Sequence, residues 1–253
     1  DAKKVIKYLE EGGTLFESSM LSTRTARVNH GSAEMNCKVY EQTSEWLNKG
    51  KLVGLVGGDH STPLGFIKAL GERYKHFGVL HIDAHADLRE AYEGFLFSHA
   101  SIMYNVLRDV ESVSKLVQVG IRDYCDDEVA LAESMGTRVV QFDDWKLASE
   151  RFEGSTWAEQ CQRIIAELPQ EVYVSFDIDG LSAEQCPGTG TPVAGGLSFH
   201  QAVYLLDAVV RSGREIIGFD LVEVAPQGGE SEWDANVGAR MLYKLCGLIL
   251  KSN

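Results

Sequence analysis

One short stretch of the sequence carries three side chains that can bind a metal or transfer protons. Asp83, His85 and Asp87 follow the mostly apolar run 79–82, which is typical of a buried strand. In an extended backbone, side chains two residues apart point the same way, so we expect these three to converge. Two carboxylates and an imidazole packed together would repel and dehydrate one another unless a cation neutralised them. A metal site is therefore the first hypothesis.

The same residue types also have ordinary structural uses. An aspartate after a strand is often a helix cap or turn former, and a histidine near a sheet is often a hydrogen-bonded core residue. An Asp-x-His-x-Asp motif by itself therefore leaves metal binding and a structural role about equally open. The other strand ends of the chain decide between them.

Four further candidates also follow predicted strands: His60, Asp177, Asp179 and Glu223. The chain alternates strand, loop and helix about six times, which predicts an α/β protein with a mostly parallel sheet and helices on both faces. In such sheets, ligands bind at the carboxyl ends of the strands. Seven candidates from four strands at one edge are hard to explain as caps alone.

Six of the seven candidates form a consistent set of oxygen and nitrogen ligands: His60, Asp83, His85, Asp87, Asp177 and Asp179. This set contains no thiolate, so a harder divalent ion such as Mn²⁺ fits better than a cysteine-rich zinc or iron–sulfur site. Six ligands are too many for one catalytic ion, but they suit two ions if some carboxylates bridge. Such a pair would make hydroxide available near neutral pH, because metals lower the pKa of bound water.

The overall composition narrows the choice of partners. The 253 residues are 44% hydrophobic and 24% charged, as in an ordinary globular protein, and the formal net charge is -13. Nucleic acid needs a basic surface, so this charge argues against it and favours a small cationic substrate. No apolar run is long enough to predict a membrane span. Five cysteines without paired spacing favour a reducing cytoplasm.

We expect a single domain over residues 1–253, with an atypical or truncated N-terminal part over residues 1–50. That part predicts a helix near 2–11, a polar stretch over 17–29 and a second helix over 32–48. It carries no chemistry that the sequence can name. Later in the chain, the stretch 186–192 is too rich in glycine and proline for a helix or strand, so we expect a stiff loop beside the acidic cluster.

The sequence resembles the ureohydrolases, a family that includes arginase and agmatinase. The match runs from about residue 51 to the end of the chain, and its motifs occur in the family's order. Four stretches carry it: Gly57-Gly58-Asp59-His60-Ser61, Asp83-Ala84-His85-Ala86-Asp87, Ser175-Phe176-Asp177-Ile178-Asp179-Gly180 followed by Pro187-Gly188-Thr189-Gly190-Thr191-Pro192, and Asp220-Leu221-Val222-Glu223-Val224-Ala225-Pro226.

The resemblance implies a three-layer α/β/α hydrolase with two Mn²⁺ ions that releases urea from a guanidino compound. One ion would be bound by four side chains: His60, Asp83, Asp87 and Asp177. The other would be bound by Asp83, His85, Asp177 and Asp179, so that Asp83 and Asp177 bridge. Asp87 would assist proton transfer to the leaving nitrogen, His99 would carry protons or contact the substrate, and Glu223 would pair with the guanidinium.

Within the family, the stretch 87–94 and the following Ser98-His99-Ala100 look like agmatinases, which convert agmatine to putrescine and urea for polyamine synthesis. Arginases place an asparagine two residues after the last aspartate of the motif, where this chain has Arg89. Arg89 leaves room for a substrate with a carboxylate tail, so 4-guanidinobutyrase stays an alternative, beside guanidinase, arginase and formiminoglutamase. The resemblance also implies a homo-oligomer, a trimer or a hexamer.

Two readings outside these activities remain. Metallophosphoesterases have similar ligands, but they open with an Asp-x-His motif, whereas here Gly-Gly-Asp-His comes first. A non-catalytic relative that binds guanidines or polyamines is the second reading. The intact set of six ligands argues against it, and an absence of urea release with Mn²⁺ supplied would argue for it.

Overall fold

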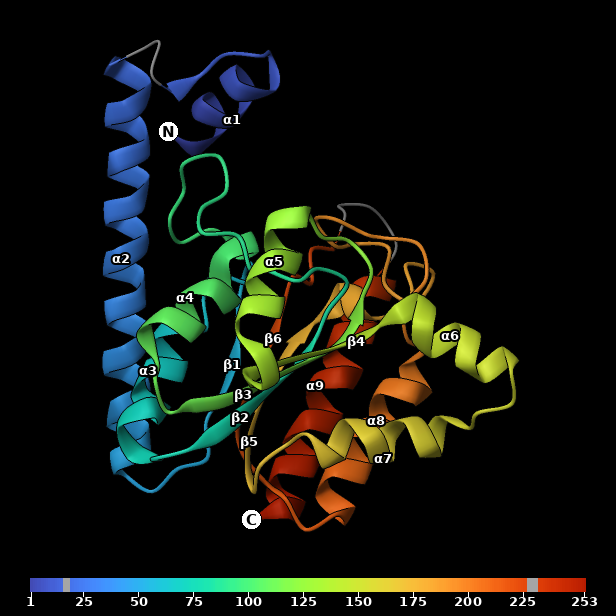
Figure 1. Ribbon diagram of the computed structural model, residues 1–253. Coiled ribbons are helices and arrows are strands. Elements are labelled where there is room, and N and C mark those ends of the chain that lie inside the picture. Colours follow the sequence, from blue (N-terminus) through green and yellow to red (C-terminus); the bar gives the residue numbers. More distant parts are fainter. Residues whose placement is uncertain (16–18, 227–231) are drawn as a thin grey trace.

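A six-stranded parallel sheet forms the centre of the computed structural model, which describes residues 1–15, 19–226 and 232–253 (Figure 1). The strand order is β1-β6-β5-β2-β3-β4. The strands are β1 (Gly54–Val56), β2 (Phe77–Ile82), β3 (Val113–Ile121), β4 (Val139–Asp143), β5 (Glu171–Asp177) and β6 (Glu215–Val222). Because neighbouring strands all pair in parallel, their carboxyl ends share one edge of the sheet.

Helices cover both faces of this sheet. One face packs against α2 (Ser19–Asn48), α3 (Leu64–Arg73), α4 (Ile102–Asp109) and α5 (Asp126–Ser134). The other packs against α6 (Asp144–Phe152), α7 (Trp157–Ala166), α8 (Phe199–Arg211) and α9 (Trp233–Ser252). The predicted three-layer α/β/α fold is therefore confirmed.

The central strands are almost continuously apolar because both of their faces are buried. Every residue of β2 is buried, and alternate side chains enter the two cores: Val79 joins the core against α3 and α4, and Leu80 joins the core against α7 and α8. Polar residues such as His81 and Ser175 interrupt this pattern just before the carboxyl ends. Those interruptions lie beside the functional site.

The N-terminal part of the chain is helical. After α1 (Ala2–Glu10), the 30-residue helix α2 runs alongside the sheet and beyond its edge, where α1 packs against it (Figure 1). The prediction of a polar stretch before the second helix is wrong for residues 19–29, which are helical, and residues 17 and 18 lie outside the described residues. Leu21 and Val28 lie at helical spacing and pack with Val5 and its neighbours in α1, so α1 supplies the packing that stabilises this half of α2.

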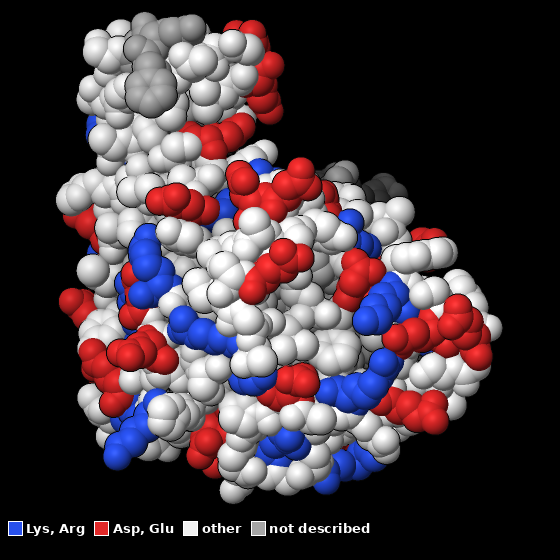
Figure 2. Space-filling model, in the orientation of Figure 1, with Lys and Arg blue, Asp and Glu red and all other residues white. Residues whose placement is uncertain are grey.

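Short 3₁₀ turns and loops complete the chain. The turns are η2 (His99–Ser101), η3 (Gly136–Arg138) and η4 (Ile178–Gly180). Residues 186–192 contain neither helix nor strand, as predicted. Among the described residues, no helix combines the length and the apolarity that crossing a membrane requires. Acidic and basic side chains are interspersed over the face of the described residues in Figure 2, which carries no large basic area.

Candidate metal centre and active site

The last residue of β5 and the segments that follow β1, β2 and β5 bring six side chains together at the carboxyl edge of the sheet. They are the six predicted from the sequence: His60, Asp83, His85, Asp87, Asp177 and Asp179. Five are buried, and the side chain of His85 is 23% exposed. The cluster is therefore closed from below by the sheet and open to solvent on the His85 side.

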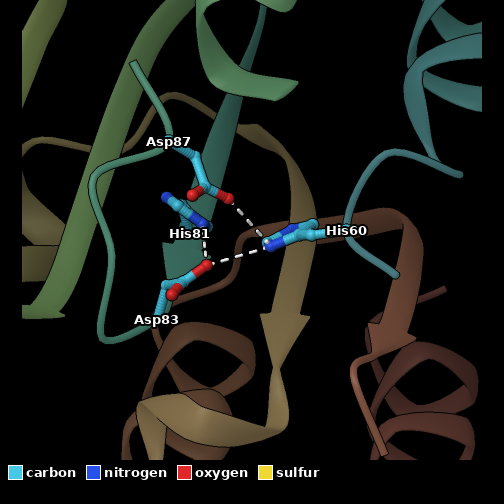
Figure 3. A group of neighbouring side chains, drawn as sticks. All are labelled: His60, His81, Asp83 and Asp87. Carbon is cyan, nitrogen blue, oxygen red and sulfur yellow. Dashed lines mark hydrogen bonds and ion pairs between the residues drawn. The ribbon is translucent and has the colours of Figure 1, made fainter. Parts of the chain in front are cut away.

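The imidazole of His60 lies among three carboxylates. Its Nδ1 is 2.9 Å from Oδ2 of Asp83, 3.2 Å from Oδ2 of Asp87 and 3.2 Å from Oδ2 of Asp177. Figure 3 shows His60 reaching across from the loop after β1 toward Asp83 and Asp87, which come from the loop after β2. Although these atoms are close, none of the three contacts has hydrogen-bond geometry, so Nδ1 has no hydrogen-bond partner.

A second group forms around His85. Its Nδ1 is 3.4 Å from Oδ1 of Asp83 and 3.2 Å from Oδ2 of Asp179. Asp83 therefore offers Oδ2 to the His60 group and Oδ1 to the His85 group. A carboxylate shared in this way is arranged to bridge two cations.

The backbone after β2 turns instead of staying extended. Asp87 has a φ of 54°, in the left-handed region that few non-glycine residues adopt, and this turn aims its carboxylate back at His60. The convergence of the Asp-x-His-x-Asp motif was expected from simple alternation along an extended chain. That reasoning is wrong at Asp87, where the turn produces the convergence.

Crowding and burial shift the pKa values of the cluster. Burial and the charge of Asp83 raise the pKa of Asp87 to about 7. Burial, with Asp83 and Asp179 adding to it, raises the pKa of Asp177 well above its ordinary value. Burial alone would lower the pKa of His85, but the neighbouring carboxylates of Asp179 and Asp83 raise it to about 11. Without a cation, the cluster therefore keeps protons that a bound cation would displace.

Two buried atoms show what kind of group the cluster can bind. Nδ1 of His60 and Oδ2 of Asp179 both point into it without a hydrogen-bond partner. Such an unpaired buried polar atom costs about 1–3 kcal/mol. Divalent cations would pair with both atoms and offset the carboxylate charges, and a set of carboxylates with two imidazoles suits hard ions such as Mn²⁺. The side chains present therefore fit a pair of divalent ions.

A chain of hydrogen bonds fixes the orientation of the His60 ring. Ser175 donates its hydroxyl hydrogen to Oδ2 of Asp220 at 2.8 Å, so its oxygen accepts from Nε2 of His60, also at 2.8 Å. Tyr173 donates to the same Asp220 oxygen at 2.7 Å. Because Nε2 carries a hydrogen, the neutral form of the ring has its lone pair on Nδ1, which faces the carboxylates. The ring is thus presented as a metal ligand through Nδ1.

Glu223 and His99 both lie near this cluster. Glu223 has a φ of 62° and accepts a hydrogen bond of 2.8 Å from the backbone N–H of His60, and burial raises its pKa. His99 begins η2, and its ring lies 6.0 Å from the ring of Tyr92, measured between centroids. Burial lowers the pKa of His99, so this imidazole is neutral at pH 7.

A cavity of about 320 Å³ opens onto the cluster. The cluster residues His85 and Asp87 line it, and the other side chains that line it include Ile6, Glu10, Arg89, Tyr92, Glu93, His99, Asp123, Glu128 and Thr191. Helix α1 therefore contributes to the wall. A larger groove of about 860 Å³, near Lys68, lies at the opposite end of the strands and contains none of the cluster residues.

Sequence reasoning missed two residues that hold the walls of this site. The Nη2 atom of Arg122 donates to the backbone oxygens of Asp179 at 2.7 Å and Val193 at 3.1 Å, which ties η4 to the long loop that follows it. Glu128 accepts from the backbone N–H of Leu88 at 2.9 Å and so fixes the loop after β2. Arg122 follows β3 immediately, and this strand-end position was the available signal.

Known proteins are similar to this chain in sequence and in fold. A family model described as the arginase family matches residues 9–247. The chain belongs to the arginase family. The resemblance seen in the sequence is thereby confirmed, and the N-terminal helices from residue 9 onward are included in the match.

Relatives with curated names are ureohydrolases. The N(1)-aminopropylagmatine ureohydrolase of Thermus thermophilus is 36% identical over 83% of this chain and 67% of its own. The agmatinase of Bacillus anthracis is 32% identical over 78% of this chain and 63% of its own. A crystal structure of a hypothetical agmatinase from Burkholderia thailandensis matches with a TM-score of 0.70 and 29% identity, over 84% of this chain and 63% of its own. The chain thus spans about two thirds of the length of these arginase-family proteins.

Proposed function

We propose that this arginase-family chain is a hydrolase with two Mn²⁺ ions that cleaves agmatine to putrescine and urea. The observation that carries the proposal is the position of Asp83, whose two oxygens face two separate groups of metal-binding atoms. Curated relatives named as ureohydrolases support the reaction class. The charge distribution around the cavity supports the choice of substrate.

The six cluster residues would hold the two ions. One set is His60, Asp83, Asp87 and Asp177, and the other is Asp83, His85, Asp177 and Asp179. When bound, two such ions lower the pKa of water by many units and so supply hydroxide near neutral pH.

Three side chains of the protein would bind the guanidinium and move protons. Glu223, fixed by its hydrogen bond from His60, would pair with the guanidinium and orient it over the cluster. Asp87 would take up the proton of the attacking hydroxide and pass it to the departing alkyl nitrogen. His99 is neutral at pH 7 and would relay protons between this site and solvent.

The mouth of the cavity favours a substrate with a positive charge at its far end. Glu10 and Glu93 both line it, and burial together with the charge of Glu10 raises the pKa of Glu93. Arg89 is already engaged, because its Nε lies 3.6 Å from Glu128 and its guanidinium lies 5.3 Å from the centre of the Tyr92 ring. A terminal ammonium, as in agmatine, suits this wall better than the carboxylate of 4-guanidinobutyrate.

N(1)-aminopropylagmatine is a second candidate substrate. The Thermus thermophilus relative, at 36% identity, is named for this compound, which carries a further amine beyond the agmatine skeleton. The two acidic side chains at the mouth suit two positive charges as well as one. Both candidates share the same chemistry at the guanidinium end.

A substrate panel tests the proposal. The purified chain would be loaded with Mn²⁺ and given agmatine, N(1)-aminopropylagmatine, arginine, 4-guanidinobutyrate, guanidine and formiminoglutamate, with urea or formamide release as the readout. We expect the highest kcat/KM with agmatine. Faster turnover of another guanidino compound would overturn the agmatine assignment, and a lack of turnover with all of them would overturn the proposed hydrolase activity.

The homo-oligomer and the cytoplasmic location stay predictions, which sedimentation and cell fractionation would check.

A further inference from the structure

A row of polar side chains crosses the sheet beneath the cluster. Strand pairing aligns Asp220 of β6, Ser175 of β5, His81 of β2, Gln118 of β3 and Gln141 of β4. We call these five residues the polar row. The first four are completely buried in strands that are otherwise apolar, so each needs a hydrogen-bond partner. At one end of the row, Asp220 and Ser175 orient the ring of His60. The remaining three residues, His81, Gln118 and Gln141, have no role in the proposed reaction.

The amide of Gln118 has only one arrangement that satisfies its neighbours. Its Nε2 donates one hydrogen to the backbone oxygen of Ala86 at 2.7 Å, and a carbonyl oxygen can only accept. Its Oε1 accepts from Nε2 of Gln141 at 2.8 Å. The amide cannot be flipped without losing both bonds. The second Nε2 hydrogen of Gln118 therefore points at Nδ1 of His81, 2.8 Å away.

This contact decides the tautomer of His81. Because Nδ1 accepts from Gln118, the ring hydrogen of neutral His81 resides on Nε2, which lies 2.7 Å from Oδ2 of Asp83. Figure 3 shows the ring of His81, which belongs to β2, directed at the carboxylate of Asp83. His81 lies close enough to His60, Asp83 and Asp87 to be considered a metal ligand. Both of its nitrogens are already used, however, so it supports the cluster and does not bind the metal.

The hydrogen bond from His81 completes the restraint on Asp83. Oδ1 of Asp83 accepts from the backbone N–H of His85 at 2.7 Å, and Oδ2 accepts from His81. With one donor on each oxygen, the plane of this carboxylate is fixed, and each oxygen keeps a lone pair for a cation. A metal-binding side chain whose orientation is already fixed binds a cation more tightly than a mobile one, because it loses less conformational entropy when the cation binds.

We propose that His81 and Gln118 are positioning residues for the metal centre: Gln118 holds His81 in the tautomer whose Nε2–H fixes Asp83 between the two metal sites. This inference rests on the proposed metal centre, but not on the identity of the substrate. Polar groups at a similar distance from a metal commonly change its affinity about 10- to 100-fold when they are removed. We expect Mn²⁺ affinity to fall within the same range when His81 or Gln118 is replaced.

Metal titration separates this role from simple packing. Gln118→Met keeps the size of the side chain but removes all three hydrogen bonds of its amide, and we expect its Mn²⁺ affinity to fall about 10-fold, measured by calorimetry. His81→Phe removes the donor itself and is expected to lose more. Gln141→Met is the matched control, because Gln141 touches Gln118 but not His81. Equal affinities in wild type and Gln118→Met would overturn the proposal, and so would equal losses in Gln118→Met and Gln141→Met.

A second measurement reads the tautomer directly and keeps the test valid if His81→Phe fails to fold. Ring nitrogen NMR signals of ¹⁵N-histidine-labelled, metal-free protein would show His81 with hydrogen on Nε2 in the wild type, and a weaker preference in Gln118→Met. A signal with hydrogen on Nδ1 in the wild type would overturn the proposal. A wild-type protein that binds no Mn²⁺ would instead contradict the proposed function, so the two failures are distinguishable.

Discussion

The backbone N–H of His60 donates a hydrogen bond of 2.8 Å to Oε1 of Glu223, across 163 residues of sequence. The bond joins the loop after β1 to the end of β6, and these two strands are neighbours in the sheet. The left-handed φ of 62° at Glu223 turns its carboxylate toward the cluster. The residue proposed to bind the guanidinium is thus held by the same loop that supplies a metal ligand.

Replacing Glu223 with glutamine tests its contact with the substrate. Glutamine keeps an oxygen that can accept from His60 but loses the negative charge, and a charge-assisted hydrogen bond contributes about 1.5–3 kcal/mol. We expect kcat/KM for agmatine to fall about 10- to 100-fold with Mn²⁺ content unchanged. Asp59→Asn, in the neighbouring loop, is the control. Unaltered kinetics in Glu223→Gln would exclude Glu223 from guanidinium binding.

The hydroxyl of Ser175 provides a second test, on the His60 side of the cluster. Ser175→Ala removes the acceptor that keeps the hydrogen of His60 on Nε2, so Mn²⁺ affinity should fall about 10-fold. Tyr173→Phe removes another donor to Asp220 without touching His60, so it should lower the free energy of unfolding by about 1–2 kcal/mol and leave Mn²⁺ affinity intact. Calorimetry and urea unfolding would measure both. Equal Mn²⁺ affinities in the two variants would contradict this assignment.

The pH dependence of kcat tests His99. Burial holds the pKa of His99 below its ordinary value of 6.5, so the ring is neutral at pH 7 and gains a proton only as the pH falls through that lowered pKa. Because the neutral ring is the form that accepts a proton, kcat should decrease below that pKa and level off above it. His99→Asn should lower kcat about 100-fold and remove this step from a profile recorded at saturating Mn²⁺. An unchanged profile in His99→Asn would show that His99 carries no proton.

Charge changes at the mouth of the cavity test substrate selection. Glu93→Gln should raise KM for agmatine about fivefold, which corresponds to about 1 kcal/mol for a partly exposed ion pair. Guanidine, which lacks a charged tail, should be unaffected. Glu90→Gln is the matched control, because Glu90 belongs to the same loop but does not line this cavity. A similar rise in KM in Glu90→Gln, or a rise for guanidine, would show that Glu93 does not contact the tail.

Much of the site could be predicted because most of its residues directly follow apolar runs that the sequence identifies as strands. A strand in a parallel sheet is apolar, and Asp83 and Asp177 follow immediately on such runs, so topology brings them to one edge. Turn geometry was harder to predict, since Asp87 adopts a φ of 54° that its neighbours in the sequence do not require. The helical half of α2 over residues 19–29 depends on packing against α1, which a local pattern does not report.

Residues that support the site were missed because their partners are distant in the sequence. Arg122 binds backbone oxygens at Asp179 and Val193, between 57 and 71 residues away. The contact of Gln118 with His81 depends on the register between β2 and β3, which the sequence does not specify locally. A polar residue inside an otherwise apolar strand that ends near a metal motif indicates a supporting role at the site. Gln118 and Asp220 are both residues of this kind.

The most direct test of the account is anomalous diffraction from a crystal grown with Mn²⁺. The six side chains that the fold brings together should surround two manganese peaks, one contacted by His60 and the other by His85, with Asp83 contacting both. A single peak, or manganese bound away from Asp83, would contradict the proposed metal centre.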